Sequence, residues 1–359
     1  MKDRTLSEFR PATVYAPCDD LWIVATYYNP AGYRTKRANY ERFAAPLRAA
    51  GIPLVTAECA FGAEPFELAA GPHVIQVRGR DVMWMKERLI NLAIAQLPAT
   101  ATKVAWVDAD ILFTNPNWAR QTSALLDHWP LVQPHDRVGR MERGQIAFAG
   151  ASRRSFACQL QRRPESARLG GAAHGQPGIA WAARRPLIEK HGLYDAAILD
   201  GGDELFAHAA GGGLNSRCVR GITCARLWRW PRLVDRILNR LSRIPWPRWL
   251  ADWYLARTQA PPVAAADESF FAHYLRWAQT LAAEVQGQIG CAPGMALHLW
   301  HGDPVNRQYG SRNAILRRHR FDPVADLRLN ETGLWEWASA KPDLHREVKE
   351  YFTSRREDG

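Results

Sequence analysis

The chain has 359 residues, 47% of them hydrophobic, and a formal net charge of +11. This length and apolar content support a packed core in one large α/β domain with additions, or in two small domains. No internal repeat is visible and no apolar run approaches the roughly 18 residues of a membrane span, so a repeat protein and an integral membrane protein are excluded.

Strands and helices alternate along the first third of the sequence. The hydrophobic patterns predict strands over 21–27, 53–58, 73–77, 104–113 and 131–133, and helices over 37–50, 84–97 and 118–128. Sequential strands joined by helical crossovers favour a parallel sheet with right-handed connections. The sequence therefore predicts a doubly wound α/β fold.

The segment 104–113 is the most informative part of the chain. It is apolar and rich in β-branched and aromatic residues, which predicts a buried strand, and Asp108 and Asp110 lie at its carboxyl end. Unpaired charge is costly in a buried strand, but two carboxylates can share a divalent cation such as Mn²⁺ or Mg²⁺. Ligands of open α/β sheets bind outside the carboxyl ends of the strands. We therefore expect a metal site here, with a solvated turn as the alternative.

Two later segments carry complementary groups. Two glycines precede Asp203 and Glu204 at the start of an apolar, helix-like run, so these acids lie at the positive end of the helix. His298 and His301 follow another apolar run. A metal centre and a carboxylate base make a coherent catalytic set. An ordinary turn and a core histidine are the alternatives.

These motifs together resemble metal-dependent glycosyltransferases of the GT-A fold, with the closest local likeness to the inverting β-1,4-galactosyltransferase and polypeptide N-acetylgalactosaminyltransferase group. Those families place an aromatic residue, a basic residue and Asn in a helix before the Asp-x-Asp strand, and Trp84, Lys86 and Asn91 match them. A Gly-rich segment, 174–181, and a helix, 185–191, follow as in the families.

The second half of the likeness contains departures. Segment 200–204 matches a Trp-Gly-Gly-Glu-Asp motif, but it has no Trp and its two acids are in reversed order. His301 matches a closing metal-binding histidine, with His298 three residues before it. The likeness covers roughly residues 20–305, motif by motif. Residues 298–310 also resemble bacterial and phage glycosyltransferase-like proteins.

The resemblance implies a GT-A (Rossmann-like) three-layer α/β/α fold with a mostly parallel sheet. We expect a single domain over 18–330 with an inserted basic helical segment, 217–258. Its nucleotide-binding half is 18–115 and its acceptor half is 116–310. A helical tail, 331–359, follows.

The resemblance also implies the reaction, in which a sugar moves from a nucleotide-diphosphate sugar, first of all a UDP-sugar, to an acceptor hydroxyl with inversion. Asp108 and Asp110 are expected to hold Mn²⁺ or Mg²⁺ against the diphosphate, with His298 or His301 completing the metal shell. Glu204 or Asp203 would be the general base. The expected nucleotide contacts are Thr26, Tyr27, Asn29, Arg34, Glu58, Trp84, Lys86, Arg88, Asn91 and Asp108.

Several alternatives stay open at this point. For Glu58, a solvated acid at a strand end competes with a nucleotide contact, and for the helix 84–97, a solvated face competes with a binding face. For the whole chain, a nucleotidyltransferase acting on sugar phosphates and a non-catalytic sugar- or polyanion-binding module compete with the transferase. The acceptor could be a glycan, a lipid-linked molecule or a protein, and the sequence does not indicate an oligomeric state.

The positive charge is concentrated in one segment. Residues 217–257 contain ten Arg, two Asp and five Trp, and the apolar spacing over 231–245 predicts a basic amphipathic helix. Three interpretations compete: packing on the protein's own core, contact of 231–257 with an anionic membrane surface, and binding of an anionic polymer. Nucleic acid is disfavoured because no nucleic-acid-binding motif accompanies the charge.

Cysteine usage and the amino terminus indicate a compartment. The six cysteines, at 18, 59, 158, 218, 224 and 291, include no Cys-x-x-Cys pair, and the amino terminus is charged without an apolar signal core. We expect reduced thiols, with neither a disulfide framework nor a zinc site. The expected location is the cytoplasm, with peripheral contact at the inner membrane face through the basic segment.

Overall fold

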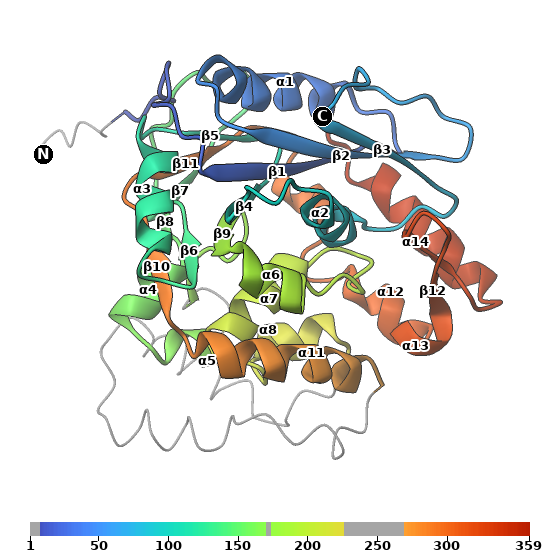
Figure 1. Ribbon diagram of the computed structural model, residues 1–359. Helices are drawn as coiled ribbons and strands as arrows, with labels where there is room; N and C mark the ends of the chain where they lie inside the picture. Colours follow the sequence, from blue (N-terminus) through green and yellow to red (C-terminus); the bar gives the residue numbers. More distant parts are fainter. Residues whose placement is uncertain (1–7, 170–173, 226–268) are drawn as a thin grey trace, which may run out of the picture.

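The computed structural model describes residues 8–169, 174–225 and 269–359 (Figure 1). The predicted helix 231–245 and the predicted membrane contact of 231–257 lie outside these residues, as does most of the expected insertion 217–258. Within the described part of the chain, no helix combines the length and the apolar character needed to cross a membrane. All six cysteines are described, and all are free thiols.

A seven-stranded sheet forms the centre of the molecule, in the order β10-β6-β9-β4-β1-β2-β3. Every neighbouring pair is parallel except the two pairs that β9 makes with β4 and β6. The strands are β1 (Leu21–Tyr28), β2 (Leu54–Phe61), β3 (Val74–Gly79), β4 (Lys103–Val107), β6 (Leu131–Gln133), β9 (Ala180–Arg184) and β10 (Ile289–Cys291).

Helices cover both faces of this sheet, and α1 and α2 lie on opposite sides of it (Figure 1). One face carries α1 (Arg34–Ala49) and α3 (Trp118–Leu126). The other carries α2 (Lys86–Ala95), α6 (Arg185–His191), α7 (Gly202–Ala210) and α11 (Ser269–Val285).

Successive side chains of the strands point alternately into the two apolar cores on either side of the sheet. In β1, Ile23 and Ala25 belong to the core beneath α1, whereas Val24 belongs to the core around α2. This alternation follows from the two-residue period of a strand. It produces the three-layer α/β/α architecture with a mostly parallel sheet, as the sequence predicted, and the arrangement is consistent with a GT-A-like fold.

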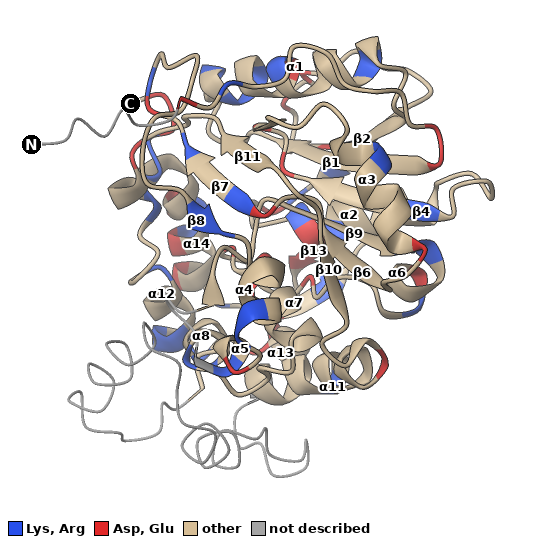
Figure 2. Ribbon diagram, turned by 90° about the vertical axis from the view of Figure 1, so that its left-hand side faces the viewer, with Lys and Arg blue, Asp and Glu red and all other residues tan. Residues whose placement is uncertain are grey.

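Smaller elements complete the molecule. A second sheet, in the order β5-β11-β7-β8, contains β5 (Ile111–Phe113), β7 (Arg137–Arg140), β8 (Arg153–Arg154) and β11 (Met295–His298). Its outer strand, β8, is basic throughout (Figure 2). The remaining elements are α4 (Phe156–Arg162), α5 (Ser166–Leu169), α8 (Arg217–Ile222), η3 (Pro304–Arg307), α12 (Asn313–Arg318), α13 (Pro323–Asp326), β12 (Leu327–Leu329), β13 (Trp335–Trp337) and α14 (Pro342–Ser354).

The predicted single strand 104–113 is wrong in one respect, because the structure divides it into β4 and β5 in different sheets. The division falls at the two carboxylates. The Asp108 amide still donates to the Ile179 carbonyl beside β9, at 2.9 Å, whereas the Asp110 carbonyl accepts from the Leu299 amide beyond β11, at 2.9 Å. The backbone thus changes partner between the two residues, and both side chains lie where the two sheets meet.

The carboxyl-terminal segment is part of the core rather than an appendage. Four residues of α14 are buried in the same apolar cluster as α2 and α7: Leu344, Val348, Tyr351 and Phe352. The Phe352 ring stacks on Trp84, with the ring centroids 6.4 Å apart. This packing carries the last residues of the chain to the edge of the central sheet.

Candidate functional site

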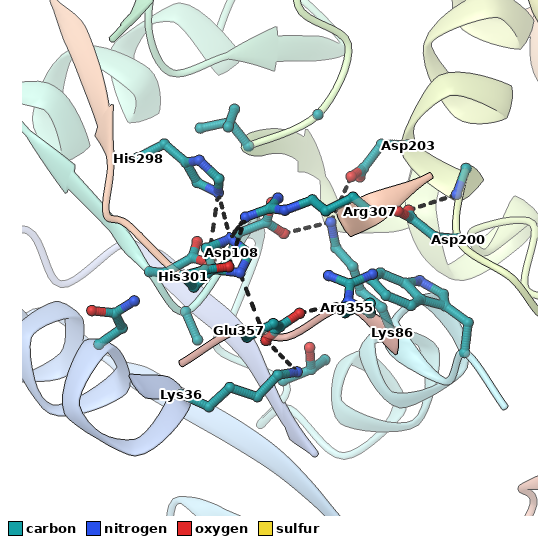
Figure 3. Close-up of a pocket in the computed structure, with 18 of the residues that line it drawn as sticks. Lys36, Lys86, Asp108, Asp200, Asp203, His298, His301, Arg307, Arg355 and Glu357 are labelled. Carbon is teal, nitrogen blue, oxygen red and sulfur yellow. Dashed lines mark hydrogen bonds and ion pairs between the residues drawn. The ribbon is translucent and has the colours of Figure 1, made fainter. Parts of the chain in front are cut away.

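A pocket opens where β1 and β4 end, and its wall combines segments from the whole length of the chain (Figure 3). It is lined by Thr26 and Tyr27 from β1, Asp108 and Asp110 after β4, and Asp203 and Glu204 at the start of α7. His298 and His301 line it as well, with Trp84 and Lys86 at the start of α2. The structure therefore brings all the predicted metal and catalytic residues to one cavity, at the edge of the sheet where an α/β fold binds ligands.

Three of these residues form a compact ligand group. Strand β11 pairs antiparallel with β5, and the register places His298 opposite Ile111, next to Asp110. Asp110 Oδ2 is 3.0 Å from His301 Nε2 and 3.6 Å from His298 Nε2. The two imidazole Nε2 atoms are 3.1 Å apart. The sheet register therefore joins residues that are nearly two hundred positions apart in the sequence.

This group, here called the pocket cluster (Asp110, His298 and His301), fits a divalent metal. Burial lowers the pKa of His298 to about 4, so its ring is neutral and has a lone pair to donate. Burial favours the protonated form of Asp110, but the two imidazoles outweigh it and hold the pKa of this carboxyl below its usual range. Asp110 Oδ1 is buried without a hydrogen-bond partner. Two imidazoles with one carboxylate suit Mn²⁺ better than Mg²⁺, which prefers oxygen ligands.

Asp108 has a different environment from Asp110. Lys86 Nζ contacts Asp108 Oδ1 and lies 2.6 Å from Asp203 Oδ2. Burial would lower the pKa of Lys86, but the two carboxylates hold it well above its usual range, so Lys86 stays charged between them. Asp108 is thus ion-paired with a cation from α2 and lies outside the group that Asp110 forms with the two histidines, so its expected role as a metal ligand stays a prediction.

The start of α7 depends on its two glycines. Gly201 has φ +105°, a conformation that glycine adopts without strain. A Cβ on Gly202 would lie 2.2 Å from the Glu87 carboxyl carbon, so any larger residue there would require the buried Glu87 side chain to move. Asp200 fixes the turn, since its Oδ1 accepts from the Gly201 amide and its Oδ2 from Arg312, both at 2.6 Å.

The two acids that follow point to different partners. Asp203 turns to Lys86, and its pKa is raised by burial, although Lys86 opposes the shift. Glu204 turns to His174, with 3.5 Å between Oε1 and Nε2. Burial would raise the pKa of Glu204, but His174 outweighs it and lowers the pKa to about 2. The contacts therefore separate two carboxylates that the sequence could not distinguish.

The sequence patterns did not indicate the basic residues and the acid that the carboxyl-terminal half contributes to the pocket. Glu357 is only 1% exposed, and its carboxylate lies 2.6 Å from Arg355 Nε, 3.8 Å from Lys36 Nζ and 3.7 Å from His301 Nδ1 (Figure 3). Arg307 contacts His301 Nε2 directly. Arg307 belongs to a run already noted for its resemblance to bacterial and phage proteins, but no local pattern indicated Arg355 or Glu357.

Five predicted nucleotide contacts do not line the pocket: Asn29, Arg34, Glu58, Arg88 and Asn91. Each has a structural partner instead. Asn29 binds the Tyr33 backbone and Glu67, and Arg34 lies near Asp358.

The other three residues, Arg88, Asn91 and Glu58, also have partners within the protein. Arg88 Nη1 lies 3.2 Å from Asp195, and Asn91 binds the Leu193 backbone. Glu58 is buried and accepts from two backbone amides and from Gln76. It is therefore not a solvated acid, and it lies outside the lining of this pocket.

Comparisons with known proteins do not assign a function to this site. No protein-family model and no curated protein sequence matches the chain. Among solved structures, it is similar to the catalytic domain of a Drosophila β1,4-galactosyltransferase 7, crystallised in complex with xylobiose, at 12% sequence identity and a TM-score of 0.27. The match covers 53% of this chain and 60% of the other. At that level of likeness, function has to be inferred from the chain's own pocket.

Proposed function

We propose that this protein is a metal-dependent glycosyltransferase that takes its sugar from a nucleotide diphosphate, with UDP-sugars as the first candidates. The observation that carries the proposal is the pocket cluster. It lies at the carboxyl ends of β1 and β4, in the same cavity as the acid pair at the start of α7. Asp110, His298 and His301 would hold the metal, which when bound stabilises negative charge on the leaving diphosphate.

Two basic residues are available for the diphosphate itself. Lys36, Lys86, Arg312 and Arg355 are each paired with a carboxylate in the described part of the chain. Arg140 and Arg307 also line the pocket, and within the described residues they contact Tyr309 and His301 rather than acids. We infer that these two guanidiniums bind phosphate oxygens, because arginine presents several donors to such groups.

The general base is assigned to Asp203. In the proposed step, the acceptor oxygen bonds to the anomeric carbon as the bond from that carbon to the diphosphate oxygen breaks, and Asp203 takes the acceptor's proton. Its raised pKa favours proton uptake, and Lys86 holds the carboxylate in place. Attack opposite the leaving group inverts the anomeric configuration. Glu204 is less suitable because its carboxylate is turned to His174.

The proposal is tested by a thermal-shift screen with UDP-, GDP-, dTDP- and CMP-sugars, each with and without Mn²⁺, followed by donor hydrolysis assays. We expect one nucleotide class to raise the melting temperature only when Mn²⁺ is present, and the same donor to be hydrolysed slowly. Pyrophosphate release from a nucleoside triphosphate and a sugar 1-phosphate would instead identify a nucleotidyltransferase. Metal-independent binding without turnover would identify a binding module.

A further inference from the structure

We propose that the protein has a second, structural metal site, a zinc site formed by His174, Glu204, His208 and Cys218. These four residues, here called the buried cluster, come from three places in the chain. Glu204 and His208 lie one turn apart on α7, Cys218 is on α8, and His174 precedes β9. The four possible ligand atoms all lie within 4.8 Å of one another.

The spacing of these atoms matches a tetrahedral centre. His174 Nε2 is 3.5 Å from Glu204 Oε1 and 3.7 Å from Cys218 Sγ. Zinc bonds of about 2.0–2.3 Å in tetrahedral geometry separate the ligand atoms by roughly 3.3–3.8 Å. Small side-chain movements would therefore complete the coordination shell.

The histidines give an independent reason for a ligand at this place. His208 is 0% exposed, and its ring nitrogens form no well-aligned hydrogen bond within the described residues, only a weak contact with the Ala167 backbone. His174 is also buried, and its Nδ1 has no partner. The Phe156 ring packs near both imidazoles, with centroids 5.7 Å from His208 and 6.1 Å from His174. Buried polar atoms in apolar surroundings are costly unless they are paired, and a metal bound to these nitrogens would remove that cost.

The donor set selects the ion. One thiolate, two imidazoles and one carboxylate suit Zn²⁺, whereas Mg²⁺ and Ca²⁺ take oxygen ligands. Four protein ligands also leave no open position, which is typical of a structural rather than a catalytic zinc. Bound there, zinc would tie the first turn of α7 to α8 and to the segment before β9. It would thereby hold the helix that carries Asp203.

Metal analysis and cobalt substitution of the full chain test this proposal. The protein is purified from zinc-supplemented medium, and its metal content is measured by mass spectrometry. We expect about one tightly held zinc ion per chain. Replacement by Co²⁺ should give a sulfur-to-cobalt charge-transfer band and intense tetrahedral ligand-field bands. Among the described residues, the pocket cluster contains no cysteine and the buried cluster contains Cys218, so a thiolate band reports on the buried cluster.

Matched variants separate binding from folding. Cys218→Ser should abolish the sulfur-to-cobalt band, whereas Cys158→Ser should retain it. His208→Asn should lose zinc, whereas His135→Asn should keep it, because His135 is equally buried and also lacks a hydrogen-bond partner but lies outside the cluster.

The proposal is overturned if wild-type protein holds no zinc after purification and takes up Co²⁺ without a thiolate band. It is equally overturned if Cys218→Ser and Cys158→Ser give the same cobalt spectrum. Should His208→Asn fail to fold, the wild-type and Cys218→Ser spectra still decide the matter. None of these outcomes depends on whether the protein transfers a sugar.

Discussion

The pocket cluster and the buried cluster are built from similar side chains but differ in access. The pocket cluster offers three donors to a cavity that also contains the acid Asp203 and two arginines, Arg140 and Arg307, that form no ion pair with a carboxylate within the described residues. The buried cluster offers four donors, and both of its imidazole rings are buried. A metal with three protein ligands keeps a position for substrate, whereas one with four does not. The number of donors and their access to the cavity, rather than residue type, therefore distinguish the proposed catalytic metal site from the proposed structural one.

Glu204 belongs to the buried cluster and also lies at the edge of the pocket. It lines the pocket, yet its carboxylate faces His174, while the preceding residue faces Lys86. Successive helical residues point about 100° apart, so one turn of α7 directs Asp203 to the pocket and Glu204 to the buried cluster. Four experiments test this division of roles.

The largest effect is expected for Asp110→Asn. The amide has no negative charge to offer a cation, so Mn²⁺ affinity should fall by more than the roughly 10–100-fold seen when a supporting group of a metal site is lost. Donor turnover should fall to background at a Mn²⁺ concentration that saturates the wild type. Calorimetric titration and donor hydrolysis measure the two quantities. Asp136→Asn, at a half-buried carboxyl outside the pocket, is the control. Near-normal turnover of Asp110→Asn in Mn²⁺ would refute the pocket cluster as a metal site.

The next effect concerns the general base. Asp203→Asn should lower turnover by about 10²–10⁴-fold, which is typical for loss of such a group, while the affinity for nucleotide with Mn²⁺ changes little. Glu204→Gln should reduce turnover less and should release zinc. Steady-state rates and metal content of the two variants give the comparison. A larger loss of turnover for Glu204→Gln would transfer the base role to Glu204.

A smaller effect on Mn²⁺ binding is expected for Glu357, which contacts a ligand of the pocket cluster rather than the metal itself. Glu357 lies 3.7 Å from His301 Nδ1, on the side of the ring opposite Asp110, and its charge supports that imidazole as a ligand. Glu357→Gln should therefore weaken Mn²⁺ binding by about 10–100-fold without changing zinc content. Glu350→Gln, on the exposed side of α14, should leave Mn²⁺ affinity unchanged. Equal Mn²⁺ affinities in the two variants would show that Glu357 has no part in the site.

The smallest effect tests whether the two clusters are independent. Cys218→Ser should change the affinity for Mn²⁺ by no more than roughly twofold, because sites without shared ligands couple weakly. The same calorimetric titration gives the value. A loss as large as that of Glu357→Gln would mean that the two clusters form one coupled centre.

Much of the fold could be predicted because it follows from local pattern. The alternating apolar residues of the strands and the amphipathic repeats of the helices are local properties, and β6 has the same bounds as predicted. The division of 104–113 into two strands could not be seen in this way. Both pieces are apolar, and only the separate partners β9 and β11 distinguish them.

A mostly parallel α/β fold and the residue types of the pocket follow from the sequence alone, because strand ends and helix starts are marked by carboxylates, glycines and histidines. Which of these groups meet depends on how distant segments pack together. Lys86 neutralises Asp108, the register of β5 with β11 delivers His298 to Asp110, and α14 brings Glu357 to His301. Glu204 and His208 are one turn apart in sequence, but their partners His174 and Cys218 lie on other segments. Such contacts depend on packing between distant segments, which no local spacing encodes.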